Sequence, residues 1–257
     1  MREFKKLHEQ EDPLLIANVW DVPSAKTAEK LNFQALGTSS AAIAAMLGYE
    51  DGEEMRFSEL EYIVQRIAAN TALPLSVDLE SGYSREPKEI ADHIRRLANL
   101  GVVGINIEDS LVDEDRSLMD ANAFASILSE VKDELTKSGQ NVFLNVRSDT
   151  FLLGLAHAVE ETQKRIRLYE KAGADGIFIP CVENENDIEA IVKSTTLPIN
   201  VMCMPGLPDF ERLKALGVRR ISMGNFLFGA LQKNYEGMLD QVITQNTFKS
   251  VFEYSKN

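Results

Sequence analysis

The sequence predicts an α/β fold, a (β/α)8 barrel with extra helices at its C-terminal end. Short apolar strand-like runs alternate with amphipathic helical patterns along the whole chain. Three predicted helices end at Gly101, Gly173 and Gly217, and an apolar strand begins within about four residues of each glycine. The 257 residues contain no linker rich in proline and serine, and this length suits one barrel. A doubly wound open sheet is the alternative fold.

Eight strands are expected, each a short run of mainly apolar residues. Their expected ranges are 14–19, 35–40, 75–79, 103–107, 142–146, 176–179, 199–202 and 220–223. Helices are expected between them over 23–31, 57–70, 87–100, 121–138, 157–172, 185–193 and 210–215. The second of these helices is the clearest, because Leu60, Ile63, Val64 and Ile67 follow the i, i+3, i+4, i+7 spacing of one helix face.

The chain is predicted to form a single domain over residues 1–257. The barrel core is expected over about residues 14–228 and a helical extension over 229–257. The segment after Asn225 contains more apolar residues than one barrel helix needs. Such a segment favours packing on a partner subunit, with a helix swapped between subunits, and so predicts a homo-oligomer. The alternative is that two helices fold back on the same barrel.

Composition argues against several classes of protein. The net charge is −13, from 27 basic and 40 acidic residues, which disfavours nucleic acids and anionic membranes as partners. No apolar run is long enough to span a membrane, and the charged N-terminus lacks the apolar core of a secretory signal. Cys181 and Cys203 lie in apolar strand-like contexts, which disfavours a structural disulfide. We therefore expect a cytoplasmic protein.

Two carboxylates, Asp78 and Glu80, lie two residues apart where the third strand ends. Side chains at positions i and i+2 of a strand point to the same face, so the two carboxylates should project together. Like charges this close must be hydrated, protonated or neutralised by a cation. Mg²⁺, or Mn²⁺ in its place, prefers such oxygen ligands. The pair therefore indicates a metal site, with a solvated acidic pair as the alternative.

More polar residues follow the next two strands. Glu108 and Asp109 follow the fourth strand, and Arg147 follows the fifth. The carboxyl ends of parallel barrel strands meet at one mouth, where barrel enzymes carry their active sites. Asp78, Glu80 and Glu108 are the predicted metal-binding residues at this mouth. Arg147 suits a carboxylate or phosphonate of the substrate, and an ion pair with Glu108 or Asp109 is its alternative role.

Other candidate residues carry less information. His8, His93 and His157 lie in charged segments and are interpreted as surface residues. The sequence shows no dyad of Cys and His, no Gly-x-Gly-x-x-Gly motif and no P-loop. Asp51 lies in a segment that is able to fold over the mouth, and an exposed turn residue is the alternative interpretation.

Five stretches carry a family likeness. They are Gly37-Thr38-Ser39-Ser40, Gly48-Tyr49-Glu50-Asp51, Val77-Asp78-Leu79-Glu80-Ser81-Gly82-Tyr83, Ile107-Glu108-Asp109-Ser110 and Asn145-Val146-Arg147-Ser148-Asp149. With these motifs the chain resembles the isocitrate lyase/phosphoenolpyruvate mutase superfamily, and more closely its short mutase-like members. The likeness runs from about Leu15 to Phe228, which is most of the chain.

The resemblance implies a Mg²⁺ ion held directly by Asp78, with Glu80 and Glu108 acting through water. It implies a small 2-oxo acid as substrate, a gating role for Asp51, and a last barrel helix swapped between subunits of a dimer or tetramer. The implied site consists of catalytic Ser39, Asp51 and Arg147, and of substrate-binding Ser39, Ser40, Ala41, Asp78, Arg147 and Asn200.

The chain also departs from the pattern of the superfamily. Lyases carry a Cys and a His in the loop after the fourth strand, whereas residues 111–119 here are largely acidic and contain neither. Cleavage of isocitrate or methylisocitrate would then need another proton donor, such as Glu114. Mutases carry Trp, Asn and His where this chain has Gly37, Arg116 and Pro180.

These observations predict a Mg²⁺-dependent enzyme that cleaves a C–C or C–P bond of a small 2-oxo acid and forms an enolate. Decarboxylation or hydrolysis of an oxaloacetate-like acid, or retro-aldol cleavage, is favoured. Phosphoenolpyruvate mutase or phosphonopyruvate hydrolase activity is one alternative, and a catalytically inactive 2-oxo acid-binding barrel is another. The sequence leaves open the substrate, the general acid or base, and whether residues 111–119 gate the site.

Overall fold

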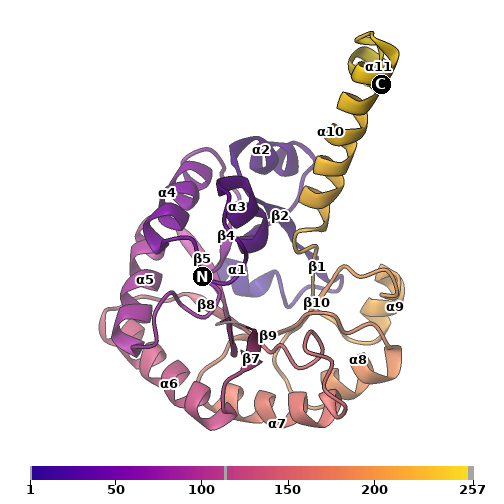
Figure 1. Ribbon diagram of the computed structural model, residues 1–257. Helices are drawn as coiled ribbons and strands as arrows, with labels where there is room; N and C mark the ends of the chain where they lie inside the picture. The colour runs from indigo at the N-terminus through magenta and orange to yellow at the C-terminus, as the bar shows by residue number, and fades with distance from the viewer. Residues whose placement is uncertain (1, 113–114, 254–257) are drawn as a thin grey trace.

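The computed structural model of the chain describes residues 2–112 and 115–253. A ring of parallel strands lies at its centre, and helices surround the ring (Figure 1). The central sheet has nine strands in the described residues. They are β1 (Leu14–Leu15), β2 (Ala17–Val19), β3 (Leu36–Thr38), β4 (Leu75–Asp78), β5 (Val102–Glu108), β8 (Phe143–Arg147), β9 (Gly176–Ile179), β10 (Ile199–Met202) and β11 (Arg220–Ser222).

The two ends of this sheet are the two halves of one segment. The first predicted strand is divided at Ile16, and β1 pairs with β11 while β2 pairs with β3. The Ile16 N–H donates to Ile221 O at 2.9 Å, and the Ala17 N–H donates to Ala35 O at 3.3 Å. The sheet therefore forms a nearly closed barrel, which confirms the predicted fold and rules out the open sheet. The ninth strand arises only from this division.

The predicted outer helices are confirmed, each within two residues of its expected ends. They are α2 (Val22–Lys30), α4 (Phe57–Ala68), α5 (Pro87–Asn99), α6 (Ala121–Lys137), α7 (Ala158–Lys171), α8 (Glu185–Val192) and α9 (Phe210–Ala215). Each packs an apolar stripe on the sheet, as α5 does with Ile90, Ile94 and Leu97. Most of the barrel interior and this outer layer form one large apolar cluster. A smaller separate cluster contains Phe4, Ile16 and Phe143.

Two elements next to the barrel mouth were not predicted. The second strand was expected to reach Ser40, but helix α3 (Ser40–Leu47) begins there. A hairpin of β6 (Ser110–Val112) and β7 (Arg116–Leu118) follows β5. Asp113 and Glu114, which come between these two strands in the sequence, are outside the described residues.

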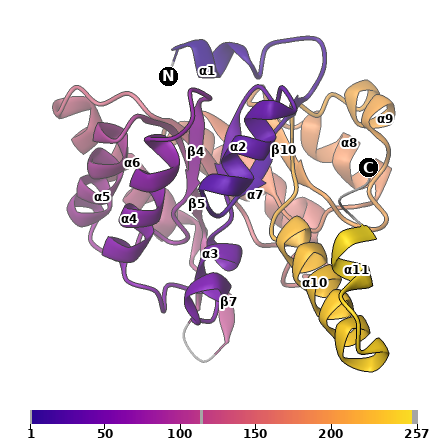
Figure 2. The ribbon, with the colours of Figure 1, turned by 90° about the horizontal axis from the view of Figure 1, so that it is seen from above.

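Short helix α1 (Arg2–Lys6) lies at the opposite end of the barrel from β7 (Figure 2). Phe4 and His8 pack there against Phe143, and the His8 ring stacks on the Phe143 ring with centroids 4.4 Å apart. The interpretation of His8 as a surface residue was wrong, because it is 5 % exposed. The sequence signal for the burial of His8 is the apolar residue Phe4, which lies one helical turn earlier.

At the C-terminal end, α10 (Phe226–Gln245) and α11 (Lys249–Glu253) project from the barrel as an arm (Figures 1 and 2). None of the side chains described in α10 is buried, although several are large and apolar. No helix among the described residues is both long and apolar enough to cross a lipid bilayer.

The burial of His8 makes a testable contribution to stability. Burial, and then the positive charge of Arg220, lower the pKa of His8 from 6.5 to about 3. Between these values the unfolded chain takes up a proton that the folded chain does not, so stability falls as pH falls. Each pH unit costs about 1.4 kcal/mol, so the protein should lose about 2 kcal/mol through His8 between pH 7 and pH 5.

Urea unfolding at both pH values measures this contribution. We expect His8→Gln to be less stable at pH 7 and to lose about 2 kcal/mol less than the unchanged protein on going to pH 5. His157→Gln, at an exposed histidine, is the matched control and should keep the original pH dependence. Equal pH dependence in all three proteins would contradict the neutral buried state of His8.

Candidate active site

A cavity of about 250 Å³ opens at the carboxyl ends of the barrel strands. Its walls come from β2, β3, β4, β5, β8, β9, β10 and β11, from the start of α3 and from the β6–β7 hairpin. The cavity brings together six of the residues that the sequence predicted: Ser39, Ser40, Ala41, Asp51, Asp78 and Arg147. Glu80, Glu108 and Asn200 do not line it.

The amino end of α3 forms one wall. Ser39 caps this helix, because its hydroxyl accepts a hydrogen bond from the Ala42 N–H at 3.3 Å. The Ser40 hydroxyl donates to Asp78 Oδ2 at 2.9 Å and lies 3.5 Å from Asp51 Oδ1. A helix amino end presents unpaired backbone N–H groups and a positive dipole, so this wall suits an anionic group.

Asp78 ends strand β4 and faces the cavity. Its backbone N–H donates to the Thr38 hydroxyl at 2.8 Å, which ties the ends of β3 and β4 together. Burial raises the pKa of its carboxyl, although the charge of Arg147 and the hydrogen bond from Ser40 act in the opposite direction.

Glu80 lies behind Asp78 and is 2 % exposed. Its backbone has a φ of 50°, a left-handed conformation that costs a non-glycine residue about 1–2 kcal/mol. The Tyr83 hydroxyl donates to its Oε1 at 3.0 Å, whereas its buried Oε2 has no partner in the described residues. Burial, and then the charges of Asp51, Asp78 and Glu108, raise the pKa of Glu80 to about 8.

Glu108 ends β5 and lies between two guanidinium groups. Arg147 Nη1 lies 2.8 Å from its Oε2, and Arg116 Nη1 donates to its Oε1. Burial raises the pKa of Glu108 to about 7, while Arg147 lowers it and Asp149 raises it further. Burial thus raises the pKa of this carboxyl group although the two guanidinium groups counteract the shift.

Arg147 is held in place by carboxylates on both sides. Its Nε donates to Asp149 Oδ1 at 2.6 Å, and its Nη1 contacts Glu108. Burial alone would lower its pKa, but Glu108, Asp149 and Asp78 outweigh burial and raise it. The ion pair with Glu108, which the sequence allowed as an alternative role, is present, and Arg147 lines the cavity as well.

Asp109 does not join the site, although it follows Glu108 directly. Arg165 Nη1, the Tyr169 hydroxyl and the Ser148 hydroxyl donate to its Oδ2 at 2.9, 2.7 and 2.8 Å. This buried network joins β5 and the residues after β8 to helix α7. Asp109 therefore fixes the positions of the strand ends that carry Glu108 and Arg147.

Arg116 is the cavity residue whose contacts the sequence did not predict. It projects from β7, donates to Glu108, Ser110 and Asp149, and forms an ion pair of 3.2 Å with Asp51. The loop that carries Asp51 and the β6–β7 hairpin are thereby joined over the mouth. The predicted gating role of Asp51 stays a prediction. The sequence signals for Arg116 were its place as a basic residue within an acidic loop and its match to an Asn position of the mutases.

Asn200 belongs to a buried polar layer below the cavity. Asn145 Nδ2 donates to Asn106 Oδ1 at 2.9 Å and to Asn200 Oδ1 at 3.1 Å. Asn200 Nδ2 donates in turn to the Ser222 hydroxyl at 3.0 Å. These bonds occupy the Asn200 amide, so its predicted contact with substrate stays a prediction.

The donor set allows a test of the expected metal. In the described part of the chain, no three His, Cys, Asp or Glu side chains are arranged to ligate one ion together. A site with direct bonds from all three predicted carboxylates is therefore not present. The unpartnered Glu80 Oε2 and the raised pKa of Glu80 instead indicate an excess of negative charge around Asp78. That excess fits a hydrated divalent cation with Asp78 as its one direct carboxylate ligand.

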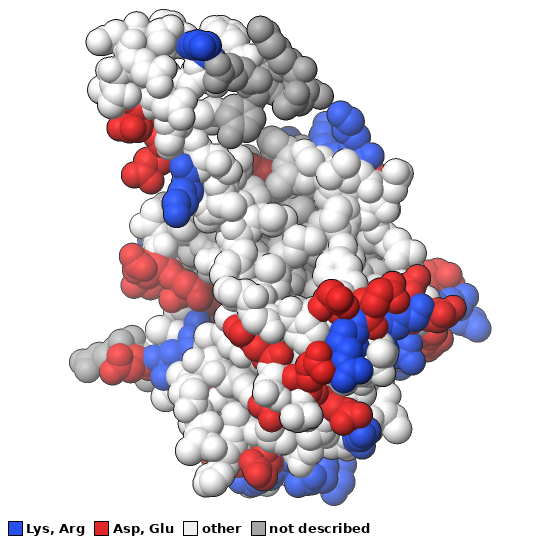
Figure 3. All heavy atoms as spheres, turned by 90° about the vertical axis from the view of Figure 1, so that its right-hand side faces the viewer, with Lys and Arg blue, Asp and Glu red and all other residues white. Residues whose placement is uncertain are grey.

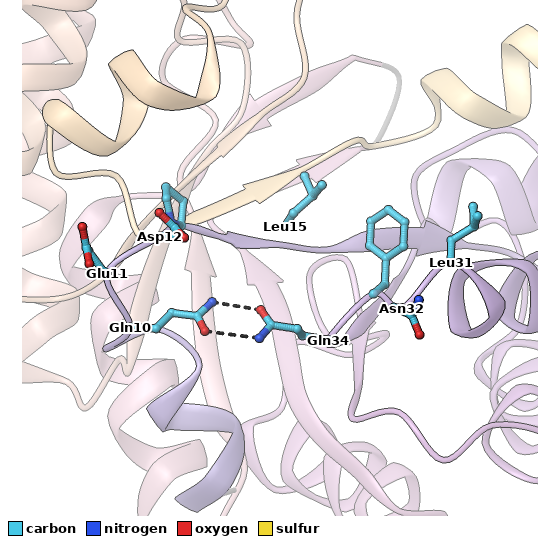
Figure 4. Close-up of a pocket in the computed structure, with 9 residues that line it drawn as sticks. Gln10, Glu11, Asp12, Leu15, Leu31, Asn32 and Gln34 are labelled. Atoms are coloured by element: carbon cyan, nitrogen blue, oxygen red, sulfur yellow. Dashed lines mark hydrogen bonds between the residues drawn. The ribbon is translucent and has the colours of Figure 1, made fainter.

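A second cavity lies at the other end of the barrel, before β1 and β3. The amides of Gln10 and Gln34 pair with each other across it, at 3.0 and 3.3 Å (Figure 4). Its two acidic residues, Glu11 and Asp12, form ion pairs with Lys214. Among the residues that the structure describes, no basic residue or histidine lines this cavity, so the mouth of the barrel is the candidate active site.

Comparison with known proteins agrees with this geometry. The family model for phosphoenolpyruvate phosphomutase matches residues 4–243. The chain belongs to the phosphoenolpyruvate phosphomutase family. The predicted superfamily is thereby confirmed, and the chain is an enzyme of the lyase or phosphonomutase-like type.

Relatives in this family have several activities. An uncharacterized protein of Mycobacterium tuberculosis (strain ATCC 25618 / H37Rv) is 34% identical over 227 residues, which cover 88% of this chain and 83% of that protein. Oxaloacetate decarboxylase of Paraburkholderia xenovorans (strain LB400) is 27% identical over 229 residues. The match covers 83% of this chain and 74% of that protein. A crystal structure from Burkholderia cenocepacia J2315, whose protein is assigned as a phosphonomutase without confirmation, has a TM-score of 0.88 and 33% sequence identity to this chain. The match covers 93% of this chain and 98% of that one.

Proposed function

We propose that this protein is a Mg²⁺-dependent enzyme that cleaves a C–C bond of a small 2-oxo acid and releases an enolate. One observation carries the proposal: Asp78, the amino end of α3 and Arg147 line the same small cavity. To bind and cleave a 2-oxo acid, a site needs hydrogen-bond donors for the carboxylate. It also needs positive charge beside the carbonyl oxygen, where an oxyanion develops. The three features supply these groups from three different elements of the barrel.

The first task of these residues is to bind and orient the acid. The backbone amides of Ser40 and Ala41, at the capped end of α3, would hold its carboxylate. Arg147 would face the carbonyl oxygen, and the carboxylates around it keep its guanidinium in one orientation. The loop that carries Asp51 and the hairpin that carries Arg116 would exclude water from above.

The second task is to hold the metal. Asp78 would hold Mg²⁺ directly, and Glu80 and Glu108 would accept hydrogen bonds from its water ligands. When bound, Mg²⁺ would supply the positive charge that polarises the carbonyl group of the substrate. Asp51 forms an ion pair at the rim of the cavity. The loop that carries this residue would close the site after the substrate has entered.

In the favoured reaction the bond between C3 and C4 of an oxaloacetate-like acid breaks. C4 leaves as CO₂, and the electron pair of the broken bond forms the C2–C3 double bond of the enolate, whose oxyanion Arg147 would stabilise. A proton from solvent then adds to C3 and gives the 2-oxo acid product. The known activity of the Paraburkholderia relative supports oxaloacetate decarboxylation, and hydrolysis and retro-aldol cleavage remain variants.

C–P bond cleavage is the second candidate. It is supported by the family model for phosphoenolpyruvate phosphomutase and by the related Burkholderia structure described as a phosphonomutase. The same carboxylate and carbonyl contacts would serve phosphonopyruvate, since only the group on C3 differs.

The net charge and the cysteines bear on the partners of the enzyme and on its cellular compartment. The net charge of −13 disfavours nucleic acids and anionic membranes as partners. Cys181 and Cys203 are both free thiols. Free cysteines suit a reducing compartment, so we place the enzyme in the cytoplasm.

The metal proposal predicts the behaviour of one variant. Asp78→Asn removes the direct ligand but keeps the size of the side chain, so it should weaken Mg²⁺ binding by about 100-fold or more. Calorimetric titration with MgCl₂ measures this directly. Asp92→Asn, at a carboxylate paired with Arg95 on the surface, is the control and should bind Mg²⁺ normally. Equal affinity in the Asp78→Asn protein would refute the site.

The reaction proposal predicts a ranking of substrates. Oxaloacetate should release pyruvate in the presence of Mg²⁺, whereas isocitrate and methylisocitrate should be cleaved negligibly, because the loop over 111–119 lacks a thiol acid. A coupled hydride assay detects pyruvate. Phosphate release from phosphonopyruvate, or its conversion to phosphoenolpyruvate, tests the C–P alternative. Efficient cleavage of methylisocitrate that Glu114→Gln abolishes would show that the ranking is wrong.

We also propose that the enzyme is a homo-oligomer in which α10 packs on a second subunit. Large apolar side chains such as Leu227, Leu231 and Leu239 are exposed on this helix. Charged side chains are sparse on the arm and on the barrel face beside it (Figure 3). An apolar hollow of about 370 Å³ between α2 and the start of α10 includes Trp20 and Leu231 and suits an incoming helix.

Light scattering at micromolar concentration tests the assembly. The unchanged protein should have at least the mass of a dimer, and Leu231→Glu should shift it towards the monomer because it buries a charge. Gln232→Glu adds the same charge at the neighbouring exposed position and is the matched control. A monomer in the unchanged protein would exclude both the oligomer and a swapped helix.

A further inference from the structure

Strand β5 has one residue more than the strand beside it. Leu75 in β4 pairs with Val102 in β5. The next residue of β4, Ser76, pairs with Gly104 rather than with Val103. Val103 is therefore an extra residue, and the shift in register marks a β-bulge in β5. Bulges are rare between parallel strands, and those beside active sites re-aim a side chain.

The bulge makes two consecutive residues of β5 face the same way. Val103 packs against the apolar cluster that contains Phe4. Gly104 faces this cluster as well, because a Cβ atom at that position would lie 2.9 Å from Phe4 Cε1. Neighbouring residues of an unbroken strand face opposite sides, and this alternation resumes after the bulge. Gly104, Asn106 and Glu108 therefore share one face, and Asn106 lines the cavity at the mouth.

This change of face decides where the carboxylate of Glu108 lies. If β5 kept the register of Val102, every later side chain would turn to the opposite face of the strand. Ile107 would then occupy the place of Glu108 at the mouth. Ile107 is instead 1 % exposed and belongs to the large apolar cluster. The bulge thus brings the third of the predicted metal-binding carboxylates to the mouth.

Contacts from two directions hold the bulge. Phe4 in α1 packs against it at the closed end of the barrel, and Gly104 leaves room for the Phe4 ring because it has no side chain. Arg220 in β11 reaches it from across the barrel. Its Nη2 lies 3.4 Å from Ser76 Oγ in β4 and 3.4 Å from Asn106 Oδ1 in β5. Arg220 thereby joins the two strands directly after the bulge.

We propose that Val103 and Gly104 are positioning residues for the metal site. The bulge that they form turns Glu108 towards the mouth, so they act through this carboxylate and not on the substrate. The inference rests on the proposed function, which assigns to Glu108 a hydrogen bond with a water ligand of Mg²⁺.

A matched pair of glycine variants tests this role. Gly104→Ala places a Cβ atom 2.9 Å from a ring carbon of Phe4, so the ring or the bulge must shift. Gly176→Ala in β9 places one 2.9 Å from a ring carbon of Phe143, away from the bulge. Both variants should lower the melting temperature. In calorimetry Gly104→Ala should weaken Mg²⁺ binding by about tenfold, whereas Gly176→Ala should keep it within about twofold. Phe4→Leu loosens the same contact without crowding it and should weaken binding in the same direction.

A double-mutant cycle shows whether the bulge acts through Glu108. Glu108→Gln should by itself weaken Mg²⁺ binding by about tenfold. In the Gly104→Ala protein the same substitution should cause little further loss, because the carboxylate no longer lies at its place. A general structural effect of Gly104→Ala would instead add to the loss that Glu108→Gln causes.

A crystal structure of the Gly104→Ala protein gives a readout that needs no metal. Arg147 Nη1 lies 2.8 Å from Glu108 Oε2 in the unchanged protein, and this contact should be lost in the variant. Equal Mg²⁺ affinities of the two glycine variants, additive losses in the cycle or an unchanged contact with Arg147 would each overturn the proposal. Absence of Mg²⁺ binding in the unchanged protein would overturn the proposed function, and the crystal structure would then decide on the bulge alone.

Discussion

The excess of carboxylates at the barrel mouth, three of which are buried, is the constraint on which the rest of the site depends. The carboxylates are Asp51, Asp78, Glu80, Glu108 and Asp149, and the guanidinium groups among them are Arg116, Arg147 and Arg220. Fully ionised, the cluster would carry two more negative than positive charges. Burial makes such an imbalance costly. Burial, and then the neighbouring carboxylates, raise the pKa of Glu80, and burial raises the pKa of Glu108. A divalent cation is the partner that would restore neutrality without protonating either residue.

The barrel creates this constraint and also supports it. Its parallel strands bring the ends of β4, β5 and β8 to one edge, which places carboxylates from separate strands close together. Hydrogen bonds below the mouth then fix their positions, such as the Thr38 bond to the Asp78 backbone and the Arg165 ion pair with Asp109. Buried ion pairs of this kind hold geometry more than they add stability. Rigid strand ends would let the α3 wall and Arg147 bind the proposed acid without rearrangement.

Much of the fold and part of the site could be predicted from sequence, for reasons that particular residues make clear. The spacing of Leu60, Val64 and Ile67 is enough to predict a helix face from local sequence. Asp78 and Arg147 could be placed at the mouth because the carboxyl ends of barrel strands meet there. Helix α3 was missed although Ser39, the alanine-rich run and Gly48 are ordinary cap and helix signals. Arg116 and Arg220 could not be placed, because a hairpin fold and an inward strand position are set by contacts between residues far apart in sequence.

The most direct test of the central claim is a crystal structure of the protein with Mg²⁺ and oxalate, which resembles the carboxylate and carbonyl groups of a 2-oxo acid. The account predicts one ion bound to Asp78, with waters between the ion and Glu80 and Glu108. It predicts oxalate between this ion, the amino end of α3 and Arg147. An ion and oxalate bound away from Asp78, or a mouth without an ion at saturating Mg²⁺, would contradict the account.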